Sequence, residues 1–160
     1  MTTLRVKVAD FAVARNGDTV IATVGLGSCV AIALYDPATK VGGLAHVLLP
    51  SESMTRDHSN RAKFPSAAVP LLLSEMRGLG SRGAVNARLV GGASMFATLL
   101  PKGGVNIGER NVAASRAALA AAGVTVLGED VGGDYGRSVF LHLADGRVEV
   151  HSLKVGRRVL

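Results

Sequence analysis

The single cysteine of the chain and one of its four histidines are the residues whose types and spacing could do covalent chemistry. Cys29 follows a glycine-rich turn in "TVGLGSCVAIALYD", and His46 lies in the next apolar run, "GGLAHVLLP". A cysteine thiol has an ordinary pKa of about 8.5 and is mostly neutral at neutral pH. A nearby imidazolium would lower that pKa and give a thiolate that attacks an acyl carbon. The two residue types therefore indicate a nucleophile and its base.

The turn between the two runs, "DPATK", predicts how Cys29 and His46 meet. If the loop is flanked by Tyr35 and Lys40, the strands pair so that Cys29 lies directly opposite His46. Directly opposed residues of an antiparallel pair share a face and have Cβ atoms about 4.5–5.5 Å apart. A bulge at Gly42–Gly43 would shift the register by one residue and put the two side chains on opposite faces.

The turn before the cysteine offers backbone groups to the same chemistry. Gly25 and Gly27 let the chain turn sharply and leave peptide N–H groups uncovered, so the amide of Cys29 or of a neighbour such as Ser28 could stabilise an oxyanion. On a flat sheet Thr23 would lie on the far side of the thiol from His46, and only a bent turn would bring it to the imidazole. The residues alone leave a structural alternative open, because free cysteines are often buried as small apolar side chains.

The N-terminal half reads as strands followed by a loop and a helix. Alternation in residues 4–8, and the runs 18–24, 29–35 and 42–49, predict four strands of one N-terminal sheet. Residues 51–64 are polar and charged without periodicity, which predicts a long exposed loop. A helix is expected in "VPLLLSEMRGLG", with Pro70 in its first turn and Gly78 or Gly80 at its end.

The C-terminal half alternates strand and helix signals. "ARLVGGASMF" predicts a buried strand that enters a glycine turn, and Asn106 with Glu109 resembles a capping box before an Ala-rich helix that ends at Gly123. "VTVLG" is a further strand. Asp145–Gly146 predicts a two-residue type I′ turn between two alternating runs, and "KVGRRVL" (154–160) a solvated basic tail.

The other polar residues have plainer explanations. The four histidines show no metal-ligand spacing, so we expect no metal. His142 is expected opposite Glu149 in the last hairpin, and His58 in solvent. Arg137 could pair with the carboxylate of Glu129, Asp130 or Asp134. It could also reach an acidic partner. Leu71–Leu73 and Met76 are expected in the core.

Composition sets the class of protein. With 160 residues we expect one domain, 1–160. No apolar run resembles a secretory signal or approaches the roughly 18 residues of a membrane span, so we expect a cytoplasmic protein without membrane insertion.

One cysteine excludes an internal disulfide and a C-x-x-C site. A net charge of +6 favours acidic partners, but without tryptophan and with only two tyrosines and four phenylalanines, base-stacking nucleic-acid binding is not expected.

The segments "TVGLGSCVAIALYDP" and "GGLAHVLLP" resemble the opening of the CheD family, the chemoreceptor glutamine deamidases of bacterial and archaeal chemotaxis. The resemblance continues through "LLLSEM", "LVGGASMF", "NIGERN" and "VGGDYGRSVFLHLADGRVEV", and is weakest around residues 51–64. It implies a layered α/β sandwich of two packed mixed or antiparallel β-sheets with helices on one side. It also implies that Cys29 is the nucleophile and His46 the base, with Thr23 as the third member of the triad.

The resemblance implies that the enzyme converts glutamine side chains on the helical cytoplasmic region of a chemoreceptor to glutamate and releases ammonia, through a thioester and without a cofactor. Some family members also bind the phosphatase CheC, which is a candidate partner here. Two alternatives stay open: a non-catalytic adaptor that binds receptors or CheC, and another cysteine hydrolase that acts on a small amide or a peptide bond.

Overall fold

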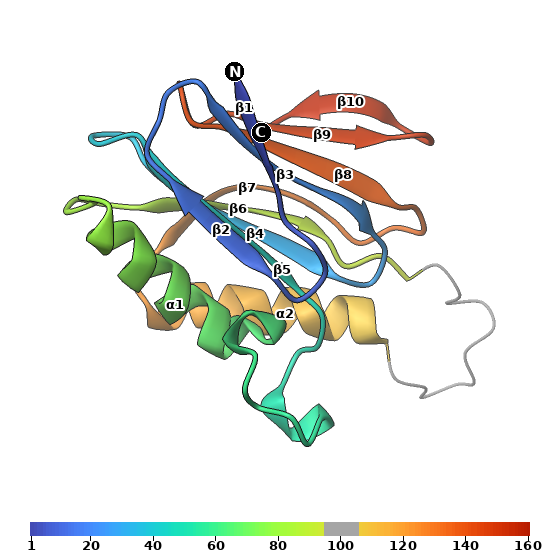
Figure 1. The fold of residues 1–160 in the computed structure, drawn as a ribbon. Coiled ribbons are helices and arrows are strands. Elements are labelled where there is room, and N and C mark those ends of the chain that lie inside the picture. Colours follow the sequence, from blue (N-terminus) through green and yellow to red (C-terminus); the bar gives the residue numbers. More distant parts are fainter. Residues whose placement is uncertain (95–105) are drawn as a thin grey trace.

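The computed structural model describes residues 1–94 and 106–160. Two five-stranded sheets pack face to face, and two α-helices cover the outer face of one of them (Figure 1). The predicted layered sandwich with helices on one side is therefore confirmed. Met95 and Phe96, which end the predicted segment "ARLVGGASMF", lie outside the described residues.

The elements follow one another along the chain with few long connections. The strands are β1 (Thr2–Arg5), β2 (Phe11–Ala14), β3 (Thr19–Leu26), β4 (Val30–Asp36), β5 (Val41–Val47), β6 (Asn86–Gly91), β7 (Thr125–Val131), β8 (Arg137–His142), β9 (Val148–Ser152) and β10 (Gly156–Val159). The α-helices are α1 (Pro65–Gly78) and α2 (Ile107–Ala121), and the short 3₁₀ helices are η1 (Glu52–Met54) and η2 (Arg61–Lys63).

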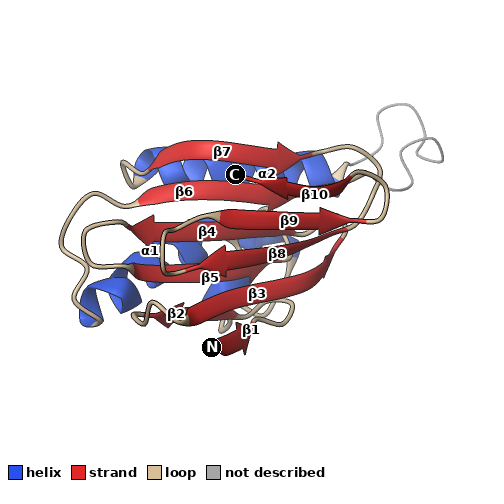
Figure 2. Cartoon of the chain, turned by 90° about the horizontal axis from the view of Figure 1, so that it is seen from above, coloured by secondary structure: helices blue, strands red, loops and turns tan. Residues whose placement is uncertain are grey.

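The four N-terminal strands that the sequence predicts do not form one sheet, and that prediction is wrong. The first sheet has the order β1-β3-β8-β9-β10, whereas the second sheet has the order β2-β5-β4-β6-β7 (Figure 2). The chain therefore passes from one sheet to the other between β3 and β4. Cys29 stands at this crossing, directly before β4.

The second sheet is the middle layer and is buried on both faces. Val30, Ile32 and Leu34 of β4 face the helices, while Ala31 and Ala33 face the first sheet. All seven residues of β4 and all seven of β5 are buried. A strand buried on both faces needs apolar residues at every position, which explains the unbroken runs in these segments.

Two short edge strands escape the sequence analysis. β2 pairs with β5, and β10 pairs antiparallel with β9. The predicted tail over residues 154–160 is solvated at Gly156–Val159, as expected, but these four residues form β10, so the prediction of a tail is wrong there. This strand contains two arginines. Charged side chains are common on sheet edges, so an edge strand lacks the apolar alternation by which a strand is recognised in a sequence.

Helix α1 begins earlier than predicted. Pro65 occupies its first position, where the fixed φ of proline suits a helix and a missing N–H costs nothing. Pro70 therefore lies inside the helix and not in its first turn, with its side chain exposed. Leu72 and Met76 are fully buried, as expected, whereas Leu71 and Leu73 are only half-buried. Helix α2 is capped as predicted, because the Asn106 side chain accepts a hydrogen bond from the Glu109 N–H.

The last hairpin has a longer turn than predicted. Phe140, and not His142, lies opposite Glu149, and β8 and β9 are joined across residues 143–147. Gly146 has a positive φ of 79°, but Asp145 does not, which excludes the type I′ turn. The predicted long loop 51–64 is also more ordered than expected, since it contains η1 and η2 and ends in the buried Phe64.

Candidate functional site

Cys29 and His46 lie on the same face of the second sheet, although not directly opposite each other. In the β4–β5 pair, Asp36 lies opposite Val41 and Ala31 lies opposite His46, so the predicted register is wrong by two residues. Lys40 adopts a positive φ of 59° and belongs to the loop. A shift of two preserves the face, because side chains alternate with a period of two. The prediction that the thiol and the imidazole share a face is therefore confirmed.

The two side chains are diagonal neighbours across the hairpin. Such pairs have Cα atoms about 7–8 Å apart, within reach of an aromatic ring. The pairing of β4 with β5 is continuous from Val30 to Asp36, without the bulge at Gly42–Gly43 that would have separated them. The face they share is the interface between the two sheets, where His46 is fully buried and Cys29 is 9% exposed.

Thr23 reaches His46 from the opposite sheet. The Thr23 hydroxyl lies 2.7 Å from His46 Nδ1, and it also donates to the carbonyl oxygen of Val6 at 2.7 Å. No bent turn within one sheet is needed, because β3 belongs to the first sheet and β5 to the second. The structure thus brings Thr23 and His46 together, by a route that the sequence analysis did not foresee.

A bulge in β3 lets this strand point two nearby side chains inward. Thr23 lies opposite Val139, and Leu26 lies opposite Arg137, so β3 has one extra residue between them. In a regular strand, residues three positions apart such as Thr23 and Leu26 face opposite sides of the sheet, whereas the extra residue lets both be buried. Gly25 supplies the bend with a φ of +72°, a conformation that glycine adopts at little cost.

The hydrogen bonds of Thr23 fix the tautomer of His46. A carbonyl oxygen only accepts, so the single hydroxyl proton of Thr23 goes to Val6 and the hydroxyl accepts the Nδ1–H of His46. The other nitrogen, Nε2, is then the basic one in the neutral ring. It is buried and has no hydrogen-bond partner among the described residues.

Burial disfavours the charged form of both candidate groups. Desolvation lowers the pKa of the His46 imidazole below its usual value. Desolvation also raises the pKa of the Cys29 thiol, and a hydrogen bond from the Cys29 backbone amide opposes this increase only in part. Burial thus disfavours the thiolate and the imidazolium alike, whereas the sequence analysis expected an imidazolium at His46 to lower the thiol pKa.

The turn that carries Cys29 is held by backbone hydrogen bonds from the segment after β6. The carbonyl of Gly27 accepts from Ala93 N–H at 2.9 Å, and that of Cys29 accepts from Gly92 N–H at 2.8 Å. Gly27 does not adopt a positive φ, and Ser28 is exposed. The Cys29 N–H lies beside its own sulfur, where it opposes the rise of the thiol pKa.

The remaining predicted residues lie away from this site or have structural partners. Glu149 contacts two histidines. An oxygen of its carboxylate lies 3.1 Å from His151 Nε2, and the other lies 3.1 Å from His142 Nε2 without hydrogen-bond geometry. His58 is exposed, and its Nε2 contacts the carbonyls of residues 52 and 55.

Arg137 is buried and selects one of its three candidate carboxylates. Its Nε donates to Asp130 at 3.0 Å, and its Nη1 donates to the carbonyl of Gly132 at 2.8 Å. Asp130 belongs to β7 and Arg137 to β8, so the ion pair joins the two sheets. Glu129 pairs instead with Arg116, and Asp134 contacts Lys154.

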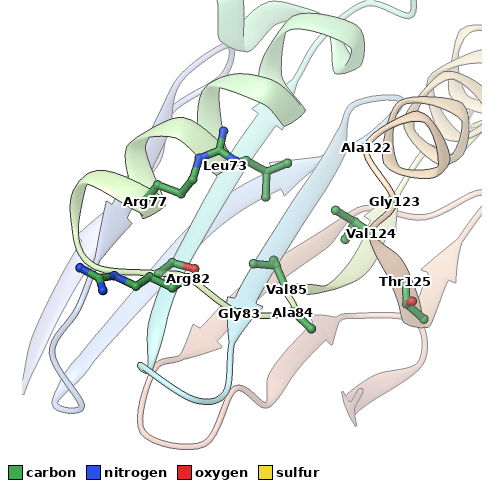
Figure 3. A pocket seen from close by; sticks show the side chains of 11 residues that line it. Leu73, Arg77, Arg82, Gly83, Ala84, Val85, Ala122, Gly123, Val124 and Thr125 are labelled. Atoms are coloured by element: carbon green, nitrogen blue, oxygen red, sulfur yellow. The ribbon is translucent and has the colours of Figure 1, made fainter.

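A cavity of about 290 Å³ lies between the ends of α1 and α2, and it contains none of the candidate residues (Figure 3). Its lining includes Ser81 and Gly83, which contact Asp36 at the end of β4, whereas Cys29 precedes the start of that strand. In Figure 3 the Arg82 side chain extends away from Val85 and Val124. The cavity is therefore separate from the candidate site.

The described residues, 1–94 and 106–160, contain no group of three or more histidine, cysteine or acidic side chains that could hold a metal ion. Within the same residues, the helices are too short or too polar to cross a membrane.

Sequence reasoning missed two contributors to the site. The Val6 carbonyl anchors Thr23, and the Asn111 side chain on α2 donates to the carbonyl of Ser28. A backbone carbonyl leaves no signal in a sequence. Asn111 does leave a signal in the sequence, because it is a polar residue on the buried face of α2, which also carries Gly108, Ser115 and Leu119.

Comparisons with known proteins show which family the chain is similar to. The family model described as "CheD chemotactic sensory transduction" matches residues 48–152, which begin just after His46. A probable chemoreceptor glutamine deamidase CheD of Caldanaerobacter subterraneus subsp. tengcongensis is 40% identical over 154 residues, 96% of this chain and 94% of the relative. The protein of that name from Pyrococcus horikoshii is 40% identical over 98% of this chain and 96% of its own.

A third relative, the probable chemoreceptor glutamine deamidase CheD 2 of Geobacter metallireducens, is 46% identical over 84% of this chain and 85% of its own. The first two alignments span nearly the whole chain, so they extend beyond the segment that the family model matches. The chain therefore belongs to the CheD family.

Proposed function

We propose that this protein is a chemoreceptor glutamine deamidase that uses Cys29 as its nucleophile. The observation that carries the proposal is the buried hydrogen bond between Thr23 and His46, which leaves Nε2 basic on the face that Cys29 shares. The relatives named as probable chemoreceptor glutamine deamidases support the reaction and the substrate class.

The first half-reaction forms a thioester. His46 Nε2 accepts the thiol proton as the sulfur attacks the carboxamide carbon of a glutamine side chain, and a C–S bond forms. The carbonyl oxygen becomes an oxyanion in the tetrahedral intermediate. His46 then donates its proton to the amide nitrogen, the C–N bond breaks, and ammonia leaves.

The second half-reaction hydrolyses the thioester. His46 Nε2 accepts a proton from water as that water attacks the acyl carbon, and the C–S bond breaks to give glutamate. The proton returns to the sulfur, so Cys29 is a thiol again. Thr23 accepts the Nδ1–H of His46 throughout and keeps Nε2 directed at the reacting groups.

The resting protonation states fit this sequence. Burial raises the pKa of the Cys29 thiol and lowers that of the His46 imidazole, which favours proton transfer that accompanies the attack on substrate over a preformed ion pair. The Cys29 N–H is our candidate for the oxyanion donor, with the Gly27–Ser28 turn placing it. We assign no cofactor to the reaction, because each step uses the thiol, the imidazole and water.

The substrate and partners follow from the family. We propose that residues 1–160 act as one domain in the cytoplasm on the helical region of a chemoreceptor, and that CheC is a second partner. The net charge of +6 favours association with an acidic receptor surface.

The proposal is tested by incubating the protein with a purified chemoreceptor cytoplasmic fragment and measuring the fragment's intact mass together with ammonia release. We expect a mass increase that corresponds to conversion of a carboxamide to a carboxylate, with one ammonia per conversion. Binding without a mass change would identify an adaptor instead. Cleaved fragments would identify a peptidase.

A further inference from the structure

Asn111 of α2 holds two backbone carbonyls at the candidate site. Its Nδ2 donates to the carbonyl of Ser28 at 2.8 Å and to that of Leu48 at 3.1 Å, and the residue is fully buried. Because a carbonyl oxygen only accepts, the nitrogen of the side-chain amide must face both oxygens. One side chain thus joins the turn that carries the nucleophile to the end of the strand that carries His46.

Among the described residues, no backbone N–H donates to the carbonyl of Ser28 or of Leu48. β5 ends at Val47, and the N–H groups of Leu48 and Leu49 both donate to the carbonyl of Lys63, at 3.0 and 3.1 Å. The strand that would continue the ladder opposite Ser28 has therefore turned away. Asn111 takes the place of the missing strand partner.

The orientation of the Ser28 carbonyl determines the orientation of the Cys29 N–H. In a trans peptide the C=O and the N–H point in opposite directions, so a carbonyl held toward α2 directs the amide away from α2. The Cys29 amide lies beside its own sulfur, where the oxygen of an attacked carboxamide would come to rest. The carbonyls on either side of Ser28 are held by Ala93 and Gly92.

Packing alone does not explain an asparagine at this position. Its Oδ1 is buried and has no hydrogen-bond partner among the described residues. An unsatisfied buried acceptor is unfavourable, and an apolar side chain would avoid it. What the asparagine provides is the pair of donors for Ser28 and Leu48.

We propose that Asn111 is a positioning residue for deamidation, which fixes the Ser28–Cys29 peptide so that the Cys29 N–H faces the oxyanion. The inference rests on the proposed function and adds a residue to it. Asn111 does not touch substrate, and its effect passes through the peptide that it holds.

The test compares Asn111→Ala and Asn111→Asp with Ser115→Ala as the matched control. Ser115 is fully buried on the same helix, and its hydroxyl donates to the Asn111 carbonyl at 2.7 Å without reaching the Cys29 turn. For each variant we would measure kcat and KM on the receptor fragment, thermal unfolding, and the pH profile of Cys29 alkylation by iodoacetamide.

Alkylation separates positioning from general damage, because it needs a thiolate but forms no oxyanion. For Asn111→Ala we expect kcat to fall about 100-fold with KM unchanged, and the midpoint of the alkylation profile to move only slightly upward, because the Cys29 amide also opposes the rise of the thiol pKa. Ser115→Ala should keep the wild-type kcat. Asn111→Asp should recover part of its lost rate, relative to wild type, as the pH falls, because a protonated carboxyl can donate one hydrogen bond whereas a carboxylate cannot.

Two results would overturn the inference: a kcat for Asn111→Ala and Asn111→Asp close to wild type, or a change in the alkylation rate of Cys29 as large as the change in kcat. If Asn111→Ala does not fold, the Asn111→Asp profile decides alone, and a ratio to wild type that does not change with pH counts against positioning. A wild-type protein that leaves the receptor fragment unchanged would instead contradict the proposed function.

Discussion

Thr23 connects His46 to the backbone of the other sheet through one hydroxyl group. This hydroxyl accepts the Nδ1–H of the imidazole and donates to the Val6 carbonyl, each at 2.7 Å. The ring orientation and the tautomer both depend on it. Thr23 therefore acts on the base, His46, and not directly on the nucleophile, Cys29.

Replacing Thr23 with valine should separate this role from packing. Valine keeps the shape but leaves His46 Nδ1 and the Val6 carbonyl without their partner, so we expect kcat to fall about 10- to 100-fold and the free energy of unfolding to fall by about 1–3 kcal/mol. Thr23→Ser retains the hydroxyl and should stay near wild type. Deamidation kinetics and denaturant unfolding measure the two effects, and a valine variant with normal kcat would remove Thr23 from the site.

The pH dependence of Cys29 alkylation tests the resting state of the site. Because burial raises the thiol pKa, the midpoint of the iodoacetamide profile should lie above the ordinary thiol value of about 8.5. The same protein unfolded in denaturant is the matched control and should show the ordinary midpoint. A folded-state midpoint in the acid range would mean that Cys29 and His46 already form a thiolate–imidazolium pair.

At the scale of elements, the site depends on a close approach between the Cys29 turn and the end of β6. Gly91 has a φ of +112°, and a Cβ atom there would lie 2.3 Å from the Cys29 carbonyl oxygen. The next residue, Gly92, donates its N–H to that same oxygen. The nucleophile is thus placed by glycines that let two backbones meet.

Gly91→Ala should disturb this approach. We expect backbone strain of about 1–3 kcal/mol, a further loss from the clash with Cys29, and a lower deamidation rate. Gly123→Ala is a suitable control, since Gly123 also has a positive φ, +70°, but a Cβ atom there meets nothing within 4 Å. Thermal unfolding and activity of the two variants give the comparison, and equal losses in both would argue against a specific role for the approach at Cys29.

Hydrophobic pattern predicted faces and strands better than it predicted sheets. Period-two alternation placed Cys29 and His46 on one face, and this survived a register error of two residues because such an error preserves the face. The same pattern could not assign β3 and β4 to different sheets, since alternation carries no information on which strand lies beside which. The Thr23–His46 contact crosses between the sheets and was therefore reachable only through the family resemblance.

Local sequence also predicted some element boundaries better than others. Asn106 with Glu109 marked the start of α2, because a cap depends on residues a few positions apart. The starts of α1 and β10 were missed, the first because Pro70 suggested a helix start that Pro65 provides, and the second because β10 is short and charged. Such short edge elements form by pairing with a neighbour, and their own sequence holds little signal.

At the scale of the whole molecule, three buried polar contacts join the two sheets. Thr23 with His46 is one such contact, and Arg137 with Asp130 is another, with both of the latter residues at most 5% exposed. Tyr35 adds a third, since its hydroxyl donates to the Leu143 carbonyl at 2.8 Å. These contacts fix how the sheet that carries Thr23 lies on the sheet that carries His46.

Removing the carboxylate of the buried ion pair should weaken the whole sandwich. Asp130→Ala leaves the Arg137 guanidinium buried without a counterion, and we expect a loss of about 3–5 kcal/mol in the free energy of unfolding. Asp134→Ala removes an exposed contact with Lys154 and should change stability little. Denaturant unfolding measures both, and equal stability of the two variants would mean that the Arg137–Asp130 pair does not join the sheets in the way described.

The most direct measurement is the deamidation rate of Cys29→Ser on a chemoreceptor fragment, with thermal unfolding as the check on the fold. Serine is nearly isosteric with cysteine, so we expect a folded protein whose rate has fallen by at least about 1,000-fold, because an alcohol does not replace the thiol as nucleophile here. A folded Cys29→Ser variant that deamidates the fragment at the wild-type rate would contradict the account.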